Sequence, residues 1–150
     1  MTMGRNPIVW LGGAAMLAAT ATDTLAILGR NLGAPLLGSI EIVQAAVLLS
    51  GTAALVLATL GDEHAKVRLI TSRLGARGTA ASRFVAALAA TVVFAALAAG
   101  SIWIAADLWD GAERSELLGI PWRILRLVAN AGLVACAALS AVALLRRKEG

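Results

Sequence analysis

Three charged residues in the first third of the chain lie in or beside long apolar segments. Asp23 falls inside the first segment, Arg30 follows it, and Glu41 falls near the beginning of the second, which we expect Pro35 to open. If these segments cross a membrane, each carboxylate is a candidate for a functional role, because acidic groups in lipid usually serve transport or pairing. The alternative is a structural ion network that fixes the turn between two helices. The lack of a second protonatable residue deeper in the segments favours this alternative.

Residues suited to catalysis or to metal binding are scarce. The chain has one histidine, His64, and one cysteine, Cys136. These numbers exclude an internal disulfide, a cysteine cluster and a two-histidine metal site within one chain. We find no glycine-rich phosphate loop, no Ser/His/Asp set at a plausible depth and no carboxylate pair around a pocket. We therefore expect no catalytic, cofactor-binding or metal-binding residue, and no enzyme.

The composition predicts an all-α integral membrane protein with four transmembrane helices in a single membrane domain, 1–150. Of its 150 residues 59% are hydrophobic and 15% charged, against about 45–50% and 25% in soluble domains. The mean hydropathy is +0.83. Four apolar stretches are long enough to cross a bilayer, which takes about 20 residues. They are residues 8–29, 36–60, 84–108 and 122–145.

The first stretch is the weakest of the four. On the insertion scale an aspartate at the membrane centre costs roughly 2.5–3.5 kcal/mol, and each Leu, Ile or Val returns about 0.3–0.6 kcal/mol. Seven such aliphatic residues in 8–29 therefore only about cancel Asp23, and we expect this helix to depend on neighbours. A cleavable secretory signal ending near Ala19–Ala21 is the alternative. The apolar run resumes at Leu25, which favours a retained span.

The distribution of basic residues predicts that both termini are cytoplasmic. With the N-terminus inside, nine Lys and Arg fall on the inner side and four on the outer side, which agrees with the positive-inside rule. The basic balance, with a pI near 10.6, then follows from topology, and no nucleic-acid partner is expected. The inner set is Arg5, Lys66, Arg68, Arg73, Arg77, Arg83, Arg146, Arg147 and Lys148, and the outer set is Arg30, Arg114, Arg123 and Arg126.

The inner connection, 61–83, allows two interpretations. Apolar residues recur at helical spacing, and basic residues fall on a separate face, which is typical of a short amphipathic helix in the headgroup region at about 65–77. A solvated basic loop is the alternative, and the sequence does not separate them. The apolar set is Val67, Ile70 and Leu74, and the basic set is Lys66, Arg73 and Arg77.

Small and aromatic residues indicate how the spans pack and where they end. Small residues at every fourth position of the last two spans permit close helix approach in lipid. Tryptophans near span ends are typical of interfacial anchors in contact with membrane lipids. The small residues are Ala87, Thr91, Ala95 and Ala99, then Gly132, Cys136 and Ser140, and the anchors are Trp10, Trp103, Trp109 and Trp122.

Three stretches together resemble the small membrane subunit of TRAP transporters, the tripartite ATP-independent periplasmic systems (the DctQ-like family). The first runs from Asp23 through Arg30 and Pro35 to Glu41, like the family's first helix end, turn and second helix. The second is His64-Ala-Lys-Val67, and the third is Ser115-Glu-Leu-Leu-Gly-Ile-Pro-Trp122. The resemblance covers nearly the whole chain. Asn31 departs from it, because the family often has an aromatic residue after the arginine.

This resemblance implies a scaffold role in the bacterial inner membrane. The partners would be a large, DctM-like permease subunit and a periplasmic solute-binding protein. Sodium and substrate, usually an organic acid such as a dicarboxylate or sialic acid, would bind in the large subunit. We expect five residues to form either an interface with a partner or a structural ion network: Asp23, Arg30, Pro35, Glu41 and His64.

A homodimeric four-helix exporter with proton coupling at Glu41 is the rival interpretation. Glu41 is the one candidate for that coupling site, but it lies near the end of a span rather than at mid-membrane. The chain also contains no tyrosine to line a cation-binding cavity. The sequence therefore favours the companion subunit.

Overall fold

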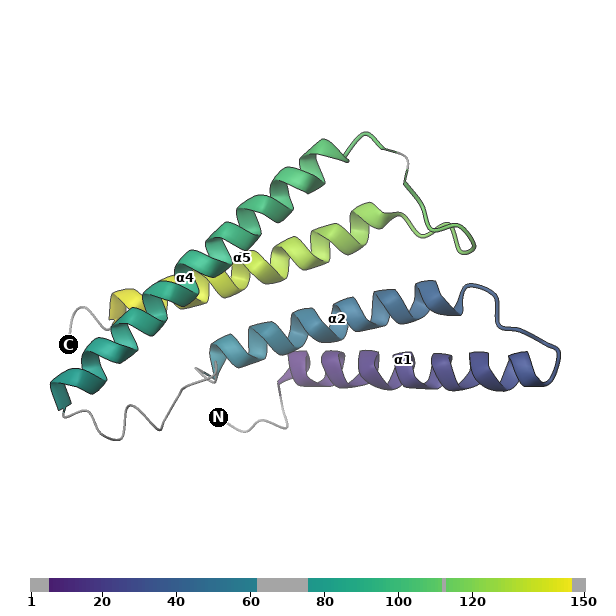
Figure 1. The fold of residues 1–150 in the computed structure, drawn as a ribbon, viewed down its shortest axis with the longest axis horizontal. Helices are drawn as coiled ribbons and strands as arrows, with labels where there is room; N and C mark the ends of the chain where they lie inside the picture. Colours follow the sequence, from purple (N-terminus) through teal and green to yellow (C-terminus); the bar gives the residue numbers. More distant parts are fainter. Residues whose placement is uncertain (1–5, 62–75, 112, 147–150) are drawn as a thin grey trace.

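A computed structural model describes residues 6–61, 76–111 and 113–146 of the chain. Within these ranges it contains four helices, α1 (Pro7–Asn31), α2 (Ser39–Leu60), α4 (Ala76–Asp107) and α5 (Trp122–Arg146). Each is long and apolar enough to cross a membrane. The predicted all-α, four-span fold is confirmed. The first turn of α1 and the last turn of α5 lie at the same end of the bundle (Figure 1).

Helix α1 has a start and a stop that its sequence explains. The side chain of Asn6 accepts a hydrogen bond from the backbone N–H of Ile8 (3.1 Å), and Pro7 occupies the first helical position, where its missing N–H costs least. At the other end Gly33 has a φ of +76°. This left-handed conformation suits glycine and reverses the chain after Asn31.

Helix α2 begins three residues later than expected. We expected Pro35 to open the second span, but Pro35 lies in the connection and Ser39 is the first helical residue. Gly38, the N-cap, has a φ of +77°. This left-handed conformation prevents α2 from extending back through residue 38. Glu41 falls in the first turn of α2, where the helix dipole favours a negative charge.

Helix α4 begins eight residues earlier than the predicted span. The apolar stretch starts at Phe84, but the helix starts at Ala76. Hydropathy marks where lipid begins, whereas a helix continues for as long as its backbone hydrogen bonds do. Residues 76–83 are therefore helix rather than loop. The amphipathic helix expected at about 65–77, and His64, fall almost entirely outside the described residues.

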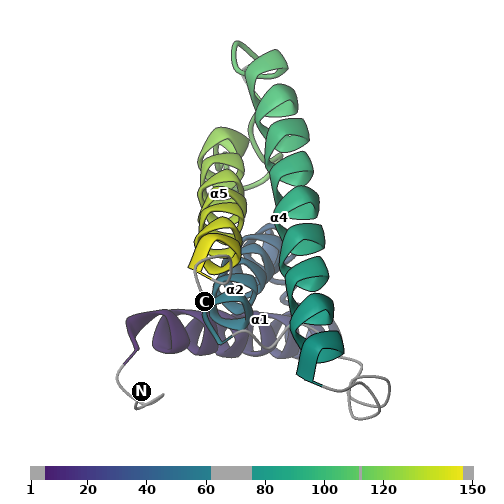
Figure 2. The ribbon, with the colours of Figure 1, turned by 90° about the vertical axis from the view of Figure 1, so that its left-hand side faces the viewer.

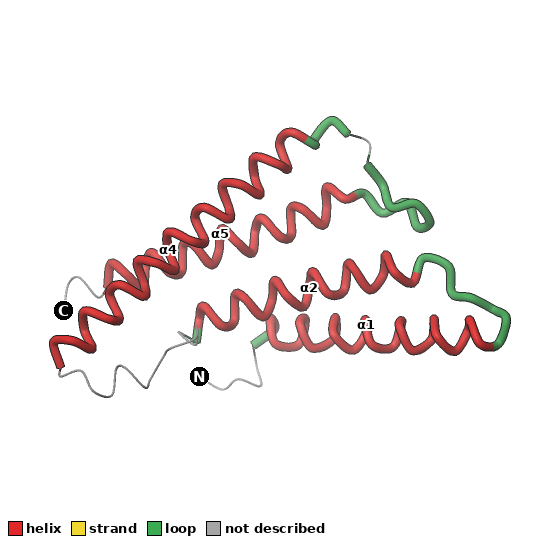
Figure 3. The backbone as a smooth tube through the Cα atoms, viewed as in Figure 1, coloured by secondary structure: helices red, strands yellow, loops and turns green. Residues whose placement is uncertain are grey.

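The helices form two antiparallel hairpins that meet along α2 and α5. Among the described residues α1 packs against α2, α2 against α5, and α5 against α4. The spatial order is therefore α1–α2–α5–α4, and α4 diverges from the first hairpin (Figures 1 and 2). The connection between α1 and α2 and the connection between α4 and α5 lie at one end of the bundle (Figure 3). We call this end the junction.

Small residues occupy most of the buried positions on the four helices. Gly132, Cys136 and Ser140 of α5 are buried, as their spacing predicted, and Cys136 is completely inaccessible. A Cβ atom at Gly132 would lie 2.2 Å from Cγ2 of Thr52 in α2. In α4 the predicted stripe is buried only in part within the chain, and contact of its other positions with a partner stays a prediction. Ala87 is buried but Ala95 and Ala99 are exposed, and the buried positions beyond it are Phe94, Ala98 and Ala105.

Candidate functional site

The α4–α5 connection ends in a tightly hydrogen-bonded turn, residues 113–121, which we call the junction loop. Ser115 organises it. Its N–H donates to the carbonyl of Ile120 (2.9 Å), its hydroxyl accepts from the N–H of Ile120 (2.9 Å), and its carbonyl accepts from Gly119 (3.2 Å). Gly119 has a φ of +64°, which closes the turn without strain. The result is a rigid loop that directs the backbone N–H groups of Leu117 and Leu118 outwards.

Glu41 binds this loop to the start of α2. The N–H of Leu117 donates to its Oε1 and the N–H of Leu118 to its Oε2, both at 2.8 Å. Hydrogen bonds to an ionised carboxylate are stronger than neutral ones, and a paired arrangement also fixes orientation. Residues 76 positions apart in the chain are thereby joined. Glu41 acts here as a clamp between the two hairpins.

Gly38 completes the clamp by allowing close approach. A Cβ atom at this position would lie 2.8 Å from Cγ of Leu118, closer than carbon atoms pack. The side chain of Leu118 therefore covers the α-carbon of Gly38 while its N–H bonds to Glu41. Two features of one short segment, a glycine and an acid three residues later, both serve the contact with the junction loop.

An open groove of about 560 Å³ lies between the hairpins at this end. Its lining includes Arg30, Pro35 and Glu41, three of the residues singled out in the sequence, together with Arg114 and Trp122. The structure therefore brings the predicted turn residues into one site, the junction groove. Asp23 does not belong to it.

Asp23, Arg30 and Glu41 form no ion network with one another within the chain, and pairing across subunits stays a prediction. The side chains of Asp23 and Arg30 make no hydrogen bond or ion pair in the described ranges, and the Glu41 carboxylate accepts from backbone donors instead. Asp23 is exposed on α1. The reason is geometric, because the junction loop reaches the Glu41 carboxylate from the opposite hairpin.

The tryptophans divide into two groups. Trp10, Trp103 and Trp109 are well exposed, at the start of α1, near the end of α4 and just beyond α4. These positions suit the predicted interfacial anchors, which stay a prediction. Trp122 is half-buried and lines the junction groove, so its contacts are with the protein as well.

Two polar contacts within the second hairpin were not anticipated. Arg126 of α5 pairs with Glu113 of the junction loop, and the hydroxyl of Ser101 in α4 donates to the side-chain oxygen of Asn130 in α5. The serine and the asparagine lie inside apolar stretches, where polar side chains often bond across helices. That signal could have identified the second contact, whereas the first depends on the loop conformation.

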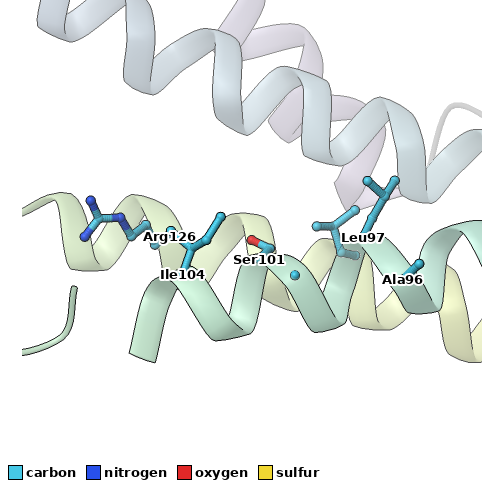
Figure 4. Close-up of a pocket in the computed structure, with 7 residues that line it drawn as sticks. Ala96, Leu97, Ser101, Ile104 and Arg126 are labelled. Atoms are coloured by element: carbon cyan, nitrogen blue, oxygen red, sulfur yellow. The ribbon is translucent and has the colours of Figure 1, made fainter. Parts of the chain in front are cut away.

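A second groove, of about 400 Å³, runs between α4 and α5. Figure 4 shows Arg126 at one end and Ala96 and Leu97 at the other, with Ser101 between them. Its lining is apolar apart from Ser101 and Arg126. The carboxylates and the thiol in the described ranges form no group that could hold a metal ion. The polar chemistry of the described residues is that of helix and loop contacts.

Comparison with known proteins identifies the family. The family model described as "Tripartite ATP-independent periplasmic transporters, DctQ component" matches residues 19–149. No curated protein and no solved structure matches the chain. The match begins within α1 and includes the junction, α2, α4 and α5. Four membrane-length helices in a permease family indicate a multi-pass protein of the inner membrane. The chain belongs to the DctQ component family, the small membrane component of tripartite ATP-independent periplasmic transporters.

Proposed function

We propose that this chain is a scaffold subunit that supports a large, DctM-like permease in sodium-driven uptake fed by a periplasmic binding protein. The family is one of transporter components rather than enzymes. Sodium and substrate would bind in the large subunit. The transported class would be organic acids, such as dicarboxylates or sialic acid.

The junction is the observation that carries this proposal. Both carboxylate oxygens of Glu41 are used to hold the junction loop, and most buried positions along α2 and α5 are small residues. These features give the two hairpins a fixed relative position. A permease whose own helices move during transport needs fixed helices beside it. Helices held in fixed positions are poorly suited to form a transport pathway themselves.

The junction groove supports a role in docking at the outer face. With the predicted topology, Arg30 and Arg114 would face the periplasm beside exposed leucines, Leu37 and Leu117. A surface of this kind, cationic and apolar, suits contact with another protein at the headgroup level. The periplasmic binding protein and the outer loops of the permease are the partners we propose for it.

Co-expression with the large permease tests the proposal. The two chains should purify together through a tag on either one, in several mild detergents. Arg30→Ala should reduce the yield of complex more than it changes which substrates the complex transports, because Arg30 lies on a surface and not in a passage. Separate elution of the wild-type chains in every detergent would contradict the proposal.

The homodimeric exporter makes the opposite prediction. Purified chain alone in liposomes would show proton-coupled efflux, and Glu41→Gln would abolish it. We expect no efflux, because Glu41 lies in the first turn of α2 and is held by Leu117 and Leu118.

A further inference from the structure

Asp23 is in an unusual position for an acidic residue in a membrane helix. It precedes Gly29, the end of the predicted span, by six positions, or about 9 Å at 1.5 Å per residue. Its short side chain cannot cover that distance to the headgroups. Acidic residues at such depth nearly always face a bundle interior or a water-filled cavity. Asp23 is instead exposed on the outside of the chain, with no hydrogen-bond or ion-pair partner in the described ranges.

The surface around Asp23 differs from a lipid-facing surface. Exposed residues at helical spacing form one face of α1, which we call the Asp23 face. It lies beside the face that packs on α2, whose members include Ala15, Ala19 and Ala26. The Asp23 face consists of Gly13, Met16, Thr20, Asp23, Thr24 and Ile27.

The polar and small members of this face suit contact with another helix. The hydroxyls of Thr20 and Thr24 donate to the carbonyls of Met16 and Thr20, at 3.1 and 2.8 Å, so each hydroxyl oxygen can still accept a bond. A Cβ atom at Gly13 would meet nothing within 4 Å. Glycine and threonine allow close approach of helices in lipid, and polar side chains bond across them. An exposed carboxylate adds a demand for a cationic or strongly donating partner at the same depth.

We propose that the Asp23 face is the surface on which the large permease subunit docks, with Asp23 accepting from an Arg, Lys or amide side chain of a permease helix. This inference rests on the proposed function. A lipid cannot meet the demand, because headgroups lie outside the hydrocarbon. The other described helices do not meet it either, since α1 contacts neither α4 nor α5 among the described residues.

Substitution of Asp23 in the co-expressed complex tests the inference. Asp23→Leu should lower the permease recovered with the tagged small subunit at least tenfold, and Asp23→Asn, which still accepts a hydrogen bond, should lower it less. The isolated Asp23→Leu chain should keep its melting temperature in detergent, because Asp23 has no partner within the chain to lose. Asp107→Leu is the matched control, an exposed acid at the end of α4, and should leave recovery unchanged.

Photo-cross-linking then locates the face. A benzophenone amino acid at Thr20 should cross-link to the permease, and the same probe at Val92, exposed on α4, should cross-link much less. Cross-links from Thr20 to a second copy of this chain or to lipid alone, in a complex that still purifies together, would overturn the inference. The same holds if Asp23→Leu leaves recovery at the wild-type level. Both outcomes leave the proposed function standing, whereas failure of the wild-type chains to purify together removes both.

Discussion

Replacing Gly132 by alanine should force α2 and α5 apart, and trimming Thr52 should restore the contact. A Cβ atom at position 132 would lie 2.2 Å from Cγ2 of Thr52, but 3.5 and 3.9 Å from its Cβ and Oγ1. Carbon atoms pack best at about 3.5–4.0 Å. The Cγ2 methyl group of Thr52 is therefore the one group that would clash with a Cβ atom at position 132. Threonine in a helix has two favoured χ1 rotamers, so few other positions are open to this methyl group.

The magnitude follows from this geometry. Overpacking a close contact costs about 1–3 kcal/mol, which lowers the folded-to-unfolded ratio roughly fivefold to 150-fold at 1.4 kcal/mol per factor of ten. Thr52→Ser removes Cγ2 and leaves the new Cβ at ordinary contact distance from the remaining atoms. The double variant should therefore recover most of the loss, and the coupling energy should be about 1–3 kcal/mol.

The measurement is the free energy of unfolding of the purified chain in mixed micelles, from a reversible SDS titration followed by tryptophan fluorescence. Gly51→Ala and Gly100→Ala are matched controls, because a Cβ atom at either helical glycine meets nothing within 4 Å. Both should be neutral or slightly stabilising. If Gly132→Ala were as stable as these controls, or if its loss persisted with Thr52→Ser, the close contact would not hold the hairpins together.

Three further predictions concern the junction and the core. Glu41→Ala should free the junction loop and raise its rate of cleavage by added protease, and Glu41→Gln should do so less, because one amide oxygen can still accept one bond. Gly38→Ala should destabilise the chain more than Gly33→Ala, since both have positive φ but only position 38 meets Leu118; melting temperatures compare them, and Leu118→Ala should remove the difference. Cys136, which is completely buried, should react with maleimide only after unfolding, and rapid labelling of the folded chain would contradict its position.

The spans could be read from the sequence because lipid imposes a length and a composition on each of them. Their ends could not. Helix α4 extends to Ala76 although the apolar stretch begins at Phe84, since hydrogen bonding continues through residues that hydropathy marks as polar. In α2 the positive φ of Gly38 decides the start, and a φ angle is not visible in composition.

The faces of the helices were only partly predictable for a related reason. In α5 the small residues other than alanine stand at every fourth position, and all three are buried. In α4 alanines occur on every side, so spacing alone could not select the packed stripe, and Phe94 fills a position that a small residue might have taken. The side of α4 that is buried depends on the surface of α5 against which it packs. The sequence of α4 alone does not specify that surface.

The partners of Glu41 could not be predicted because they are backbone groups. When only the sequence is known, an acid such as Glu41 is naturally paired with the nearest base, which is Arg30. In the structure the acid meets N–H groups of Leu117 and Leu118, whose availability depends on how Ser115 folds the turn. The signals that were present, a serine, a glycine and a proline close together, indicate a turn but not what the turn binds.

Two of the contacts between the hairpins, at Glu41 and at Thr52, together restrain the relative orientation of the hairpins. Glu41 and Thr52 are eleven residues apart on α2, or about 16 Å along the helix, and each meets the second hairpin, at the junction loop and at Gly132. One contact would leave the hairpins free to pivot about it, whereas two at different depths fix the angle between α2 and α5. That angle determines where α1 and α4 lie, because each of them packs on one neighbour among the described residues. The outer faces of α1 and α4 are therefore positioned by contacts that α2 and α5 make with each other.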